Sequence, residues 1–388
     1  MNVLKHVKVM TVFGTRPEAV KMAPLIKELK SCPEIECLVC VTAQHRQMLD
    51  QVLELFDIVP DYDLDIMKER QTLADITVNA LMGLDKVFRE NRPDIVLVHG
   101  DTTTTFVASL CAFYNKIKVG HVEAGLRTFD KYFPYPEEMN RKLTGAVTDI
   151  HFAPTETNKQ NLLNEGVDEK SIYVTGNTVI DALKTTVDKN YEFENKDLQA
   201  VDFSKRVIAV TAHRRENIGQ PLIDICTAFK ELAENYDDVR IVYAVHLNPV
   251  VQETARSILS GVKGVHLTEP LGPRDMHNFL DRCYMVMTDS GGLQEEAPSL
   301  GKPVLVLRNE TERPEAVKAG TVKIAGTDKA NVYKMAAELL DNYEEYERMA
   351  HAVNPYGDGN ASRRIADALL YYFGISDKEP EQFRPQYI

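Results

Sequence analysis

Carboxylates, arginines and prolines crowd one segment of the chain, residues 121–141. The segment joins His-Val-Glu-Ala-Gly-Leu-Arg-Thr to a proline-broken Tyr-Phe-Pro-Tyr-Pro-Glu-Glu-Met-Asn-Arg, and its ionisable groups include Glu123, Arg127, Glu137, Glu138 and Arg141. Carboxylates can move protons and guanidiniums can hold an anionic leaving group, so the segment suits a reaction that needs both. The alternative is a solvated turn with surface ion pairs, which needs no function.

Basic residues and a further carboxylate follow two apolar runs near the N-terminus. Gly14-Thr15-Arg16-Pro17-Glu18 comes directly after the first run, where the glycine predicts a tight turn and the proline the start of a helix. Arg16 and Lys21 would then lie near the positive end of that helix, where anions bind. Asp101 follows the second run, and two roles stay open for it: the N-cap of the next helix or a catalytic carboxylate.

A histidine and several arginines in the second half of the chain suit a phosphate. His213 and Arg214 directly follow an apolar run, and Arg308 and Arg313 follow a later one. Charge-assisted hydrogen bonds from such groups hold phosphate oxygens strongly. The sequence contains neither G-x-G-x-x-G, the dinucleotide-binding fingerprint, nor a complete phosphate-loop motif.

A glycine motif between Arg214 and Arg308 also suits a phosphate. Ser290, Gly291 and Gly292 precede a helix predicted at 293–300, and their backbone N–H groups could cradle a pyrophosphate. Glu296 lies one turn into that helix, where its carboxylate could hold ribose hydroxyls. A plain helix cap and turn is the alternative for the Ser-Gly-Gly motif.

Length and composition restrict the class of protein. The 388 residues fit two domains, and 44% hydrophobic with 27% charged residues is typical of a soluble globular protein. A net charge of −13 argues against a nucleic-acid binder, although local arginines still allow a small anionic ligand. His6 and Lys8 interrupt the N-terminal apolar run, so no signal peptide is expected, and no run reaches the ~20 apolar residues of a membrane span. We expect a cytoplasmic protein.

The six cysteines show no spacing typical of a disulfide framework, which indicates a reducing compartment. Cys37 and Cys40 have the spacing of a metal or redox pair. They lie in a predicted strand, however, where positions i and i+3 face opposite sides. The strand therefore argues against a metal at this pair.

Short β-branched runs alternate with amphipathic stretches such as 17–30 and 72–90, in two series. This pattern predicts an α/β fold with two doubly wound, Rossmann-like domains. The strands expected in the first series are Val7–Phe13, Glu36–Thr42, Asp94–His99, Lys118–Val122, Asp149–Ala153 and Ile172–Thr175. Those expected in the second series are Arg206–Thr211, Val239–Val245, Gly264–Thr268, Tyr284–Thr288 and Pro303–Leu307.

The two series place the domains at 1–180 and 200–360, with a polar, irregular stretch and a hinge near 176–200 between them. The last helix, 361–373, fits either domain, and the tail to residue 388 could pack back on the first. Ligands of such sheets bind at the carboxyl ends of the strands, so two facing sheets would hold the site in their cleft. Acid/base groups in one half and phosphate-binding groups in the other predict an enzyme acting on a nucleotide sugar.

The motifs together resemble a known family. Phe13-Gly-Thr-Arg-Pro-Glu, Gly100-Asp-Thr-Thr-Thr, Gly120-His-Val-Glu-Ala-Gly-Leu-Arg, Thr211-Ala-His-Arg-Arg-Glu-Asn and Thr288-Asp-Ser-Gly-Gly-Leu-Gln-Glu-Glu-Ala-Pro occur in order, with shorter motifs at 136–138, 174–177 and 311–316. The chain is similar to the bacterial UDP-N-acetylglucosamine 2-epimerases of the non-hydrolysing kind. The resemblance implies a glycosyltransferase-B type fold and interconversion of UDP-GlcNAc and UDP-ManNAc, through elimination of UDP to a glycal and its re-addition. This chemistry requires no nicotinamide, no other cofactor and no metal, in keeping with the missing fingerprint.

The resemblance also implies roles for particular residues. The acid/base groups would be Asp101, Glu123 and Glu137, with Arg141 close by and His213 helping to hold the leaving UDP. The residues that contact the substrate would be Arg16, Lys21, Met276, Ser290, Gly291, Gly292, Glu296 and Arg313. Met276 departs from the family, which usually has an aromatic residue there beside the uracil, but methionine can still pack on a ring face. A second UDP-GlcNAc would act as an activator at Gln44, His45, Gln47, Arg70, Arg214 and His246.

Three other readings stay open beside this one. A hydrolysing epimerase would release UDP and free ManNAc, and a glycosyltransferase would share the architecture but need an acceptor surface. A catalytically silent nucleotide-sugar sensor would not need the three acid/base carboxylates. The resemblance further implies a homodimer and a role in supplying ManNAc to a surface polysaccharide, with no nucleic-acid or membrane partner.

Overall fold

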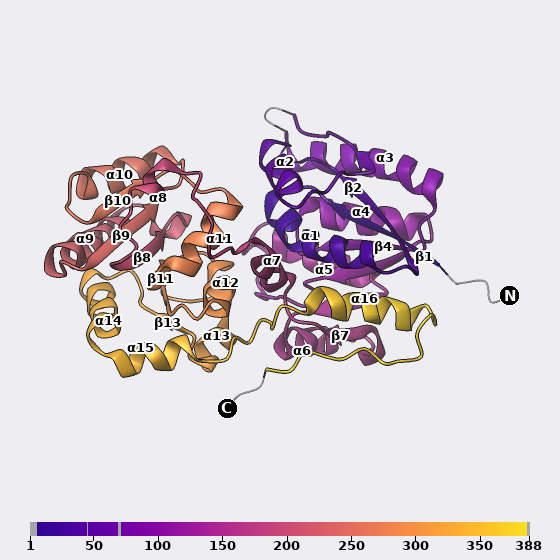
Figure 1. The fold of residues 1–388 in the computed structure, drawn as a ribbon. Helices are drawn as coiled ribbons and strands as arrows, with labels where there is room; N and C mark the ends of the chain where they lie inside the picture. Colours follow the sequence, from indigo (N-terminus) through magenta and orange to yellow (C-terminus); the bar gives the residue numbers. More distant parts are fainter. Residues whose placement is uncertain (1–5, 45, 69–70, 386–388) are drawn as a thin grey trace. The chain divides into compact units, whose positions relative to one another are not determined.

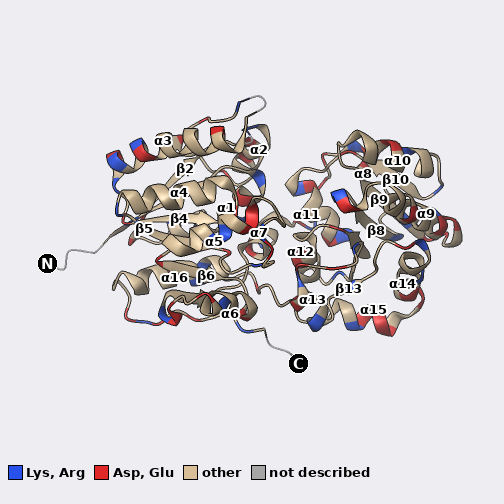
Figure 2. Ribbon diagram, turned by 180° about the vertical axis from the view of Figure 1, so that it is seen from behind, with Lys and Arg blue, Asp and Glu red and all other residues tan. Residues whose placement is uncertain are grey.

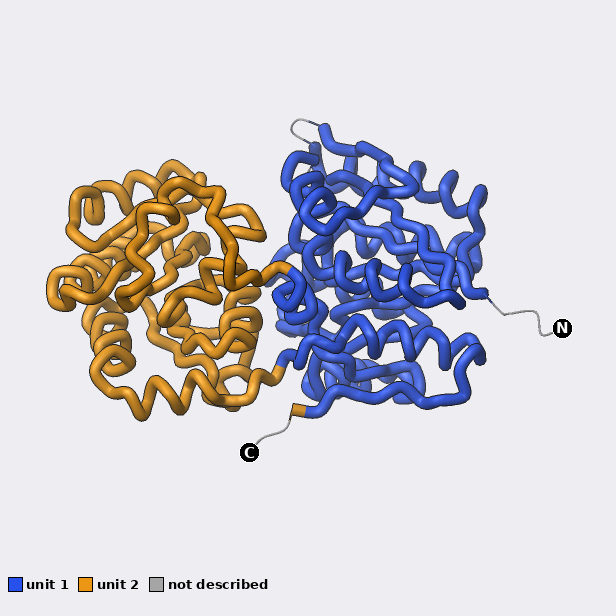
Figure 3. The backbone as a smooth tube through the Cα atoms, viewed as in Figure 1, with its two compact units in different colours: residues 1–185, 356–384 blue, residues 186–355, 385–388 orange. Residues whose placement is uncertain are grey.

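The computed structural model describes residues 6–44, 46–68 and 71–385. The chain divides into two compact units, drawn in different colours in Figure 3. Unit 1 contains residues 1–185 and 356–384, and unit 2 contains residues 186–355 together with 385–388. The chain therefore passes from unit 1 to unit 2 after Thr185 and returns at Tyr356.

Unit 1 is built on a seven-stranded sheet in the order β3-β2-β1-β4-β5-β6-β7, and each neighbouring pair is parallel. Buried Val, Ile and Leu side chains fill its central strands, as expected for a sheet covered on both faces. The strands are β1 Val7–Phe13, β2 Ile35–Val41, β3 Tyr62–Asp63, β4 Ile95–His99, β5 Lys118–Val122, β6 Ile150–Ala153 and β7 Ile172–Val174.

Helices cover both faces of this sheet (Figure 1). Alternate residues of β1 point into two different cores: Val9 and Phe13 pack with α1, α2 and α16, while Met10 and Val12 pack with α3 and α4. The helices of unit 1 are α1 Arg16–Ser31, α2 Arg46–Leu55, α3 Leu73–Asn91, α4 Thr103–Tyr114, α5 Glu137–Val147, α6 Glu156–Asn164, α7 Thr178–Thr186 and α16 Ala361–Tyr372, with a 3-10 turn η1 at Glu169–Ser171.

The last helix of the chain, α16, belongs to unit 1. It packs against α1, and its Ile365 and Leu369 are fully buried in the same core as β1. The N-terminus of α16 is tied to α7, because Asp181 accepts the backbone N–H groups of Ala361 and Ser362 at 3.2 and 2.7 Å. The C-terminal segment thus completes the first unit.

Unit 2 repeats the same plan with a six-stranded sheet in the order β10-β9-β8-β11-β12-β13, again with parallel neighbours. Helices α9, α10 and α14 enclose a core with β8, β9 and β11 on one face. The strands are β8 Arg206–Thr211, β9 Val239–Ala244, β10 Val265–Thr268, β11 Met285–Thr288, β12 Val304–Val306 and β13 Val322–Ile324. The helices are α8 Lys196–Gln199, α9 Gln220–Asn235, α10 Pro249–Leu259, α11 Pro273–Arg282, α12 Leu293–Ser299, α13 Pro314–Ala319, α14 Lys329–Asp341 and α15 Tyr343–Ala350, with a 3-10 turn η2 at Arg215–Asn217.

Both sheets have a switch point where the strand order reverses, between β1 and β4 in unit 1 and between β8 and β11 in unit 2. Ligands of doubly wound sheets bind at the carboxyl ends of the strands beside such points. Asp101 lies in the loop after β4, His213 and Arg214 lie in the loop after β8, and Ser290, Gly291 and Gly292 lie in the loop after β11. Figure 2 shows that charged residues lie mainly on helices and loops and leave the strands mostly uncharged.

The predicted fold class of two doubly wound α/β domains is confirmed, and each strand range predicted from the sequence overlaps an observed strand, with β2 beginning one residue earlier than predicted. The sequence analysis missed β3, whose two residues are too few to show a pattern, and it missed β13 at the edge of the second sheet. The irregular stretch expected beyond residue 180 begins later, since α7 continues through Thr186 and buries Ala182 and Leu183.

Glycine at position 14 was predicted to allow a tight turn, but the structure requires it because there is no space for a side chain. A Cβ at Gly14 would lie 2.0 Å from Thr42 Oγ1 and 2.8 Å from Thr104 Oγ1, so only glycine fits between these hydroxyls. Cys37 and Cys40 pack into the two different cores of unit 1, and burial raises the pKa of both thiols to about 12. Two thiols on opposite faces of a sheet cannot share one metal ion.

Among the described residues, no helix is long and apolar enough to span a membrane. Nor does the described part of the chain bring three or more histidines, cysteines or carboxylates together in a way that could hold a metal ion.

Candidate active site

Glu123 follows β5 and lies at the centre of a polar cluster in unit 1. Its Oε1 is ion-paired with Lys21 from α1 and accepts the side-chain N–H of Asn177 at 2.8 Å. Its Oε2 lies 3.8 Å from Nε2 of His99, the last residue of β4. The Glu123 backbone has a φ of +64°, a left-handed conformation that costs a non-glycine residue about 1–2 kcal/mol. Strain of this kind is typical of functional positions.

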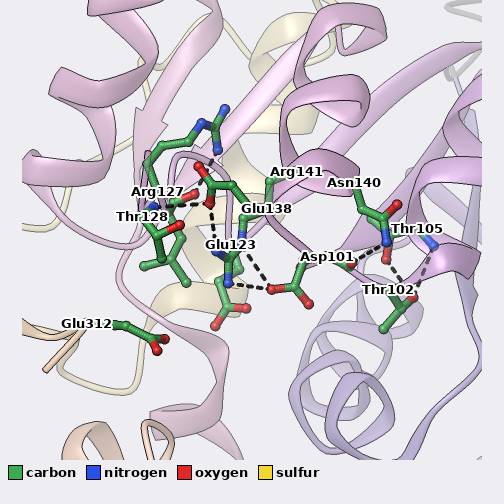
Figure 4. A network of polar contacts seen from close by, with 12 residues as sticks. Asp101, Thr102, Thr105, Glu123, Arg127, Thr128, Glu138, Asn140, Arg141 and Glu312 are labelled. Carbon is green, nitrogen blue, oxygen red and sulfur yellow. Dashed lines mark hydrogen bonds and ion pairs between the residues drawn. The ribbon is translucent and has the colours of Figure 1, made fainter. Parts of the chain in front are cut away.

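Asp101 and Arg141 form a second group beside β4 (Figure 4). Arg141, on α5, donates from Nε and Nη2 to Asp101 Oδ2 at 3.0 and 2.7 Å, and from Nη1 to Glu138 Oε2 at 3.1 Å. Glu138 is fully buried and also accepts the backbone N–H groups of Thr128 and Phe129. Arg141 therefore links the Asp101 carboxylate to a fixed, buried anchor.

Asp101 is not the N-cap of α4, which was one of its two predicted roles. Thr102 has that position, and its hydroxyl accepts the backbone N–H of Thr105 at 3.1 Å. The other predicted role, that of a catalytic carboxylate, remains. Glu137, the first residue of α5, is half-buried and lies next to Glu138 in sequence.

Glu18 holds the loops after β1 and β4 together. Its Oε2 accepts the backbone N–H groups of Gly14 and Thr15 at 3.1 and 2.9 Å, which closes a capping box at the start of α1. Its Oε1 accepts the hydroxyl of Thr102 at 2.8 Å. Burial raises the pKa of Glu18, and these hydrogen bonds oppose that rise. Glu18 thereby fixes the position of Arg16 relative to Asp101.

Three histidines are buried on neighbouring strands of the same sheet: His99 on β4, His121 on β5 and His151 on β6. Burial lowers the pKa of His99 to about 4 and that of His121 and His151 to about 3, so all three are neutral at physiological pH. His121 donates from Nε2 to the carbonyl of Gly100 at 2.7 Å, which supports the turn that leads into Asp101. The three rings contribute packing rather than charge, and His121 adds this hydrogen bond.

Unit 2 has its own cluster at the matching place, where Asp289 follows β11. Asp289 is fully buried and accepts the backbone N–H groups of His213 and Arg214 at 2.7 and 2.8 Å and the Asn217 amide at 2.9 Å. Its Oδ1 lies 2.9 Å from His213 Nδ1. Burial alone would raise the pKa of Asp289, but the hydrogen bonds from His213 and the backbone lower it. Nδ1 is therefore protonated, and Nε2 faces away from Asp289.

The glycine motif after Asp289 lies beside a fixed arginine. Arg313 forms a buried ion pair with Glu295 of α12, and a Cβ at Gly291 would lie 3.7 Å from Arg313 Nη2. Glu296 lies in the first turn of α12, 3.8 Å from His277 Nε2. The motif, whose residues are half-buried, thus lies beside a positioned guanidinium and a carboxylate, all within unit 2.

Met276 lies in the first turn of α11 and is half-buried. The ring of His246 is 5.3 Å from that of His213, and burial lowers the pKa of His246. In unit 1, Gln44 Oε1 accepts the Thr104 hydroxyl at 3.3 Å, and Gln47 is exposed on α2. The predicted positions His45 and Arg70 lie outside the described residues.

Sequence reasoning assigned no role to Glu18, Asn177 and Asp289, and named Glu138 without one. Two of these had a local signal: Thr15-x-x-Glu18 is a capping box, and Asp289 directly follows a strand. Asn177 and Glu138 belong to the motifs at 174–177 and 136–138, but these motifs do not indicate their contacts with Glu123 and Thr128, which are 54 residues and 10 residues away in the chain. Arg127 was selected as a candidate for chemistry, but its guanidinium makes two hydrogen bonds to the carboxylate of Glu165, which is an exposed residue.

Strand-end carboxylates in one Rossmann-like unit and a histidine–arginine–glycine cluster in the other define an enzyme fold of the glycosyltransferase-B type. The family model described as UDP-N-acetylglucosamine 2-epimerase matches residues 27–370. The chain belongs to this family and is an epimerase, hence an isomerase.

Individual relatives resemble nearly the whole chain. It is 59% identical over 380 residues to a UDP-N-acetylglucosamine 2-epimerase of Bacillus subtilis, covering 98% of this chain and 99% of that one. It is 54% identical over 368 residues to the enzyme of the same name from Escherichia coli K12, with 93% and 98% covered. The crystal structure of UDP-GlcNAc 2-epimerase from Neisseria meningitidis bound to UDP-GlcNAc matches with a TM-score of 0.87 at 52% identity, covering 94% of this chain and 100% of that chain.

Proposed function

We propose that this protein interconverts UDP-GlcNAc and UDP-ManNAc by inverting C2 of the sugar without hydrolysis. Family membership supports the reaction, and the Neisseria structure with UDP-GlcNAc supports the substrate. The observation that carries the proposal is the Glu123 cluster, in which a strained strand-end carboxylate is held by Lys21 and Asn177.

The reaction proceeds by elimination and re-addition. The C1–O bond breaks and its electron pair leaves with UDP, while a carboxylate takes the C2 proton and a C1=C2 double bond forms. UDP then adds back to C1 and a proton returns to the opposite face of C2. This route needs acid/base groups on both faces of the sugar, and Asp101, Glu123 and Glu137 supply them.

The positions of these carboxylates are fixed before substrate arrives. Arg141 holds Asp101 through two contacts, and Lys21 holds Glu123. Preorganised groups avoid reorganisation during the reaction, which is a large part of electrostatic catalysis. Arg16, which begins α1, adds positive charge at the same end of the sheet.

Unit 2 binds the UDP portion and stabilises it as the leaving group. Asp289 accepts from Nδ1–H of His213 and so orients the ring, and the imidazolium form of His213 donates from Nε2 to a phosphate oxygen. Gly291 and Gly292 offer backbone N–H groups to the pyrophosphate, and Arg313 adds a guanidinium. Ser290 contributes its hydroxyl, because its backbone N–H donates to Thr288 Oγ1 at 2.9 Å. The remaining contacts are those of Glu296 with the ribose and Met276 with the uracil.

A second UDP-GlcNAc acts as an activator. Its binding residues are Gln44, His45, Gln47, Arg70, Arg214 and His246. If activation is retained, UDP-ManNAc given alone reacts with a lag, which added UDP-GlcNAc removes. Full-rate conversion of UDP-ManNAc from the first seconds would contradict this part of the proposal.

The protein works as a homodimer and supplies ManNAc for a surface polysaccharide. Support for a dimer comes from apolar side chains that are exposed on α3 and at the end of α4: Val78, Met82, Phe113 and Tyr114. α3 packs against α4, and exposed apolar groups of this size are typical of an interaction surface. Met82→Arg should halve the mass measured in solution by light scattering, and an unchanged mass would place the interface elsewhere.

The test of the reaction is product analysis. UDP-GlcNAc carrying ¹⁸O in the anomeric C1–O–P bridge is incubated with the protein and followed by ³¹P and ¹H NMR. We expect UDP-ManNAc, with ¹⁸O spread to the non-bridging oxygens of the β-phosphate in recovered substrate, because the C1–O bond breaks. Free UDP with ManNAc would identify a hydrolysing enzyme, and unchanged substrate would leave a transferase or a sensor.

A further inference from the structure

Asn177 reaches Glu123 from the loop between β7 and α7. Its side chain is buried, its Nδ2 donates to Glu123 Oε1 at 2.8 Å, and its Oδ1 accepts the backbone N–H of Val179 at 3.1 Å. The bond from Val179 decides which end of the amide is oxygen, because only the oxygen can accept a hydrogen bond. The amide NH₂ is therefore turned toward the carboxylate.

The loop that carries Asn177 is bound to the C-terminal segment where that segment re-enters unit 1. The backbone N–H of Asn177 donates to the carbonyl of Tyr356 at 2.6 Å. A Cβ at Gly176, whose φ is +84°, would lie 3.2 Å from Gly357 Cα, so a side chain there would push the two segments apart.

Further contacts extend this attachment along α7. Asp181 accepts the first N–H groups of α16, and Lys184 donates to the carbonyl of Asp358 at 2.6 Å. Both segments are those by which the chain passes between the units, after Thr185 and before Tyr356. The two segments that connect the units thus fix the backbone of Asn177, and its side chain is hydrogen-bonded to Glu123.

We infer that Asn177 is a positioning residue that orients the Glu123 carboxylate for proton transfer at C2. This inference rests on the proposed function, in which Glu123 is an acid/base group. An amide suits the task because it donates a hydrogen bond at every pH and has no proton that can be lost. Lys21 neutralises the charge of Glu123, and Asn177 fixes the direction of its carboxyl group.

The substitution Asn177→Ala removes the donor, and Asn177→Asp replaces the amide by a carboxyl group of the same shape. The matched control is Thr178→Val, because Thr178 is the next residue, equally buried, and its hydroxyl has no hydrogen-bond partner in the described structure. Each variant is assayed for kcat, KM and deuterium uptake at C2 between pH 5.5 and 9, and its fold is checked by circular dichroism.

We expect Asn177→Ala to lower kcat about 10- to 100-fold, the loss typical of one hydrogen bond to a charged group, with KM changed less than about threefold. Asn177→Asp should be most active at low pH, where a neutral carboxyl can still donate to Glu123, and should lose activity as the new carboxyl ionises and repels Glu123. Thr178→Val should match the unsubstituted protein.

Two results would overturn the inference. The first is a kcat of Asn177→Ala within about twofold of the parent. The second is a loss that is equal at every pH in both Asn177 variants and as large in Thr178→Val, which would mean a general packing role. Glu123→Gln separates this failure from that of the proposed function: an active Glu123→Gln refutes the assignment of Glu123, whereas an inactive one with unaffected Asn177 variants refutes only the inference.

Discussion

Single carboxylates in this protein have distinct tasks that their sequence context does not separate. Glu137 and Glu138 are adjacent, yet Glu138 is fully buried against Arg141 and two backbone N–H groups, while Glu137 is half-buried at the helix start. From the motif Pro-Glu-Glu alone, both residues are candidates for acid/base chemistry. Only the fold distinguishes them, because the partners of Glu138 come from the loop at 128–129.

The two glutamates should respond differently to substitution. Glu138→Ala leaves a buried guanidinium short of one partner and should lower the free energy of unfolding by about 3 kcal/mol, as for a broken buried pair. Glu137→Gln should change that free energy by less than about 0.5 kcal/mol, as for a substitution outside the core, while sharply lowering turnover. Urea unfolding and activity assays on the same preparations test the contrast. A stable Glu138→Ala variant would mean that Arg141 is held by Asp101 alone.

Asp289 offers the corresponding test in unit 2. Asp289→Asn keeps the shape but removes the charge that accepts from His213 and Arg214, so UDP binding should weaken about 10- to 100-fold. Isothermal titration with UDP measures this directly. Asp237→Asn is the control, since that side chain is fully exposed in the same unit. Unchanged UDP affinity in Asp289→Asn would remove His213 from the phosphate site.

At the level of elements, the sequence predicts the strands of both sheets well, but it predicts less well what the helices and loops pack against. Buried parallel strands are runs rich in apolar and β-branched residues, so β1 and β8 have the predicted bounds, and so does the shorter β5. The placement of α16 in unit 1 could not be decided, because an amphipathic pattern shows that a helix has a buried face and not what covers it. The contact of Asn177 with Glu123 could not be predicted either, because the loop that carries Asn177 is held by Tyr356, where the chain returns to unit 1.

Helix α16 should contribute strongly to the stability of unit 1. Leu369 is fully buried beside α1 and β1, and Leu369→Ala should cost about 2–5 kcal/mol, as for other large-to-small core substitutions. Tyr371→Ala, at a 39% exposed position two residues on, is the control and should cost much less. Hydrogen exchange of peptides from β1 and α1 would locate the loss. Equal effects of both substitutions would argue against α16 as part of this core.

For the whole molecule, the buried histidines predict a loss of stability in acid. The pKa values of His99, His121 and His151 are about 4, 3 and 3 in the folded protein, whereas an unfolded histidine titrates near 6.5. Below about pH 6.5 the unfolded chain binds protons that the folded chain does not, so the free energy of unfolding falls by about 1.4 kcal/mol per pH unit for each histidine. Above about pH 7 this contribution is fully present and constant.

Urea unfolding between pH 5 and 7.5, with hydrogen exchange of β5 and β6 as the signal from unit 1, measures this slope. His151→Leu should make it shallower by about one proton, and His351→Asn, at an exposed site in unit 2, should leave it unchanged. A slope that His151→Leu does not alter would mean that this ring is protonated equally in both states.

The central claim is that C2 is inverted by removing and returning a proton. The most direct test is to incubate the protein with UDP-GlcNAc in deuterium oxide and record proton NMR spectra over time. We predict that UDP-ManNAc forms with deuterium at C2, and that deuterium also enters C2 of the remaining UDP-GlcNAc. UDP-ManNAc that still carries its original hydrogen at C2 would contradict proton exchange by the carboxylates, and an absence of UDP-ManNAc would contradict epimerisation itself.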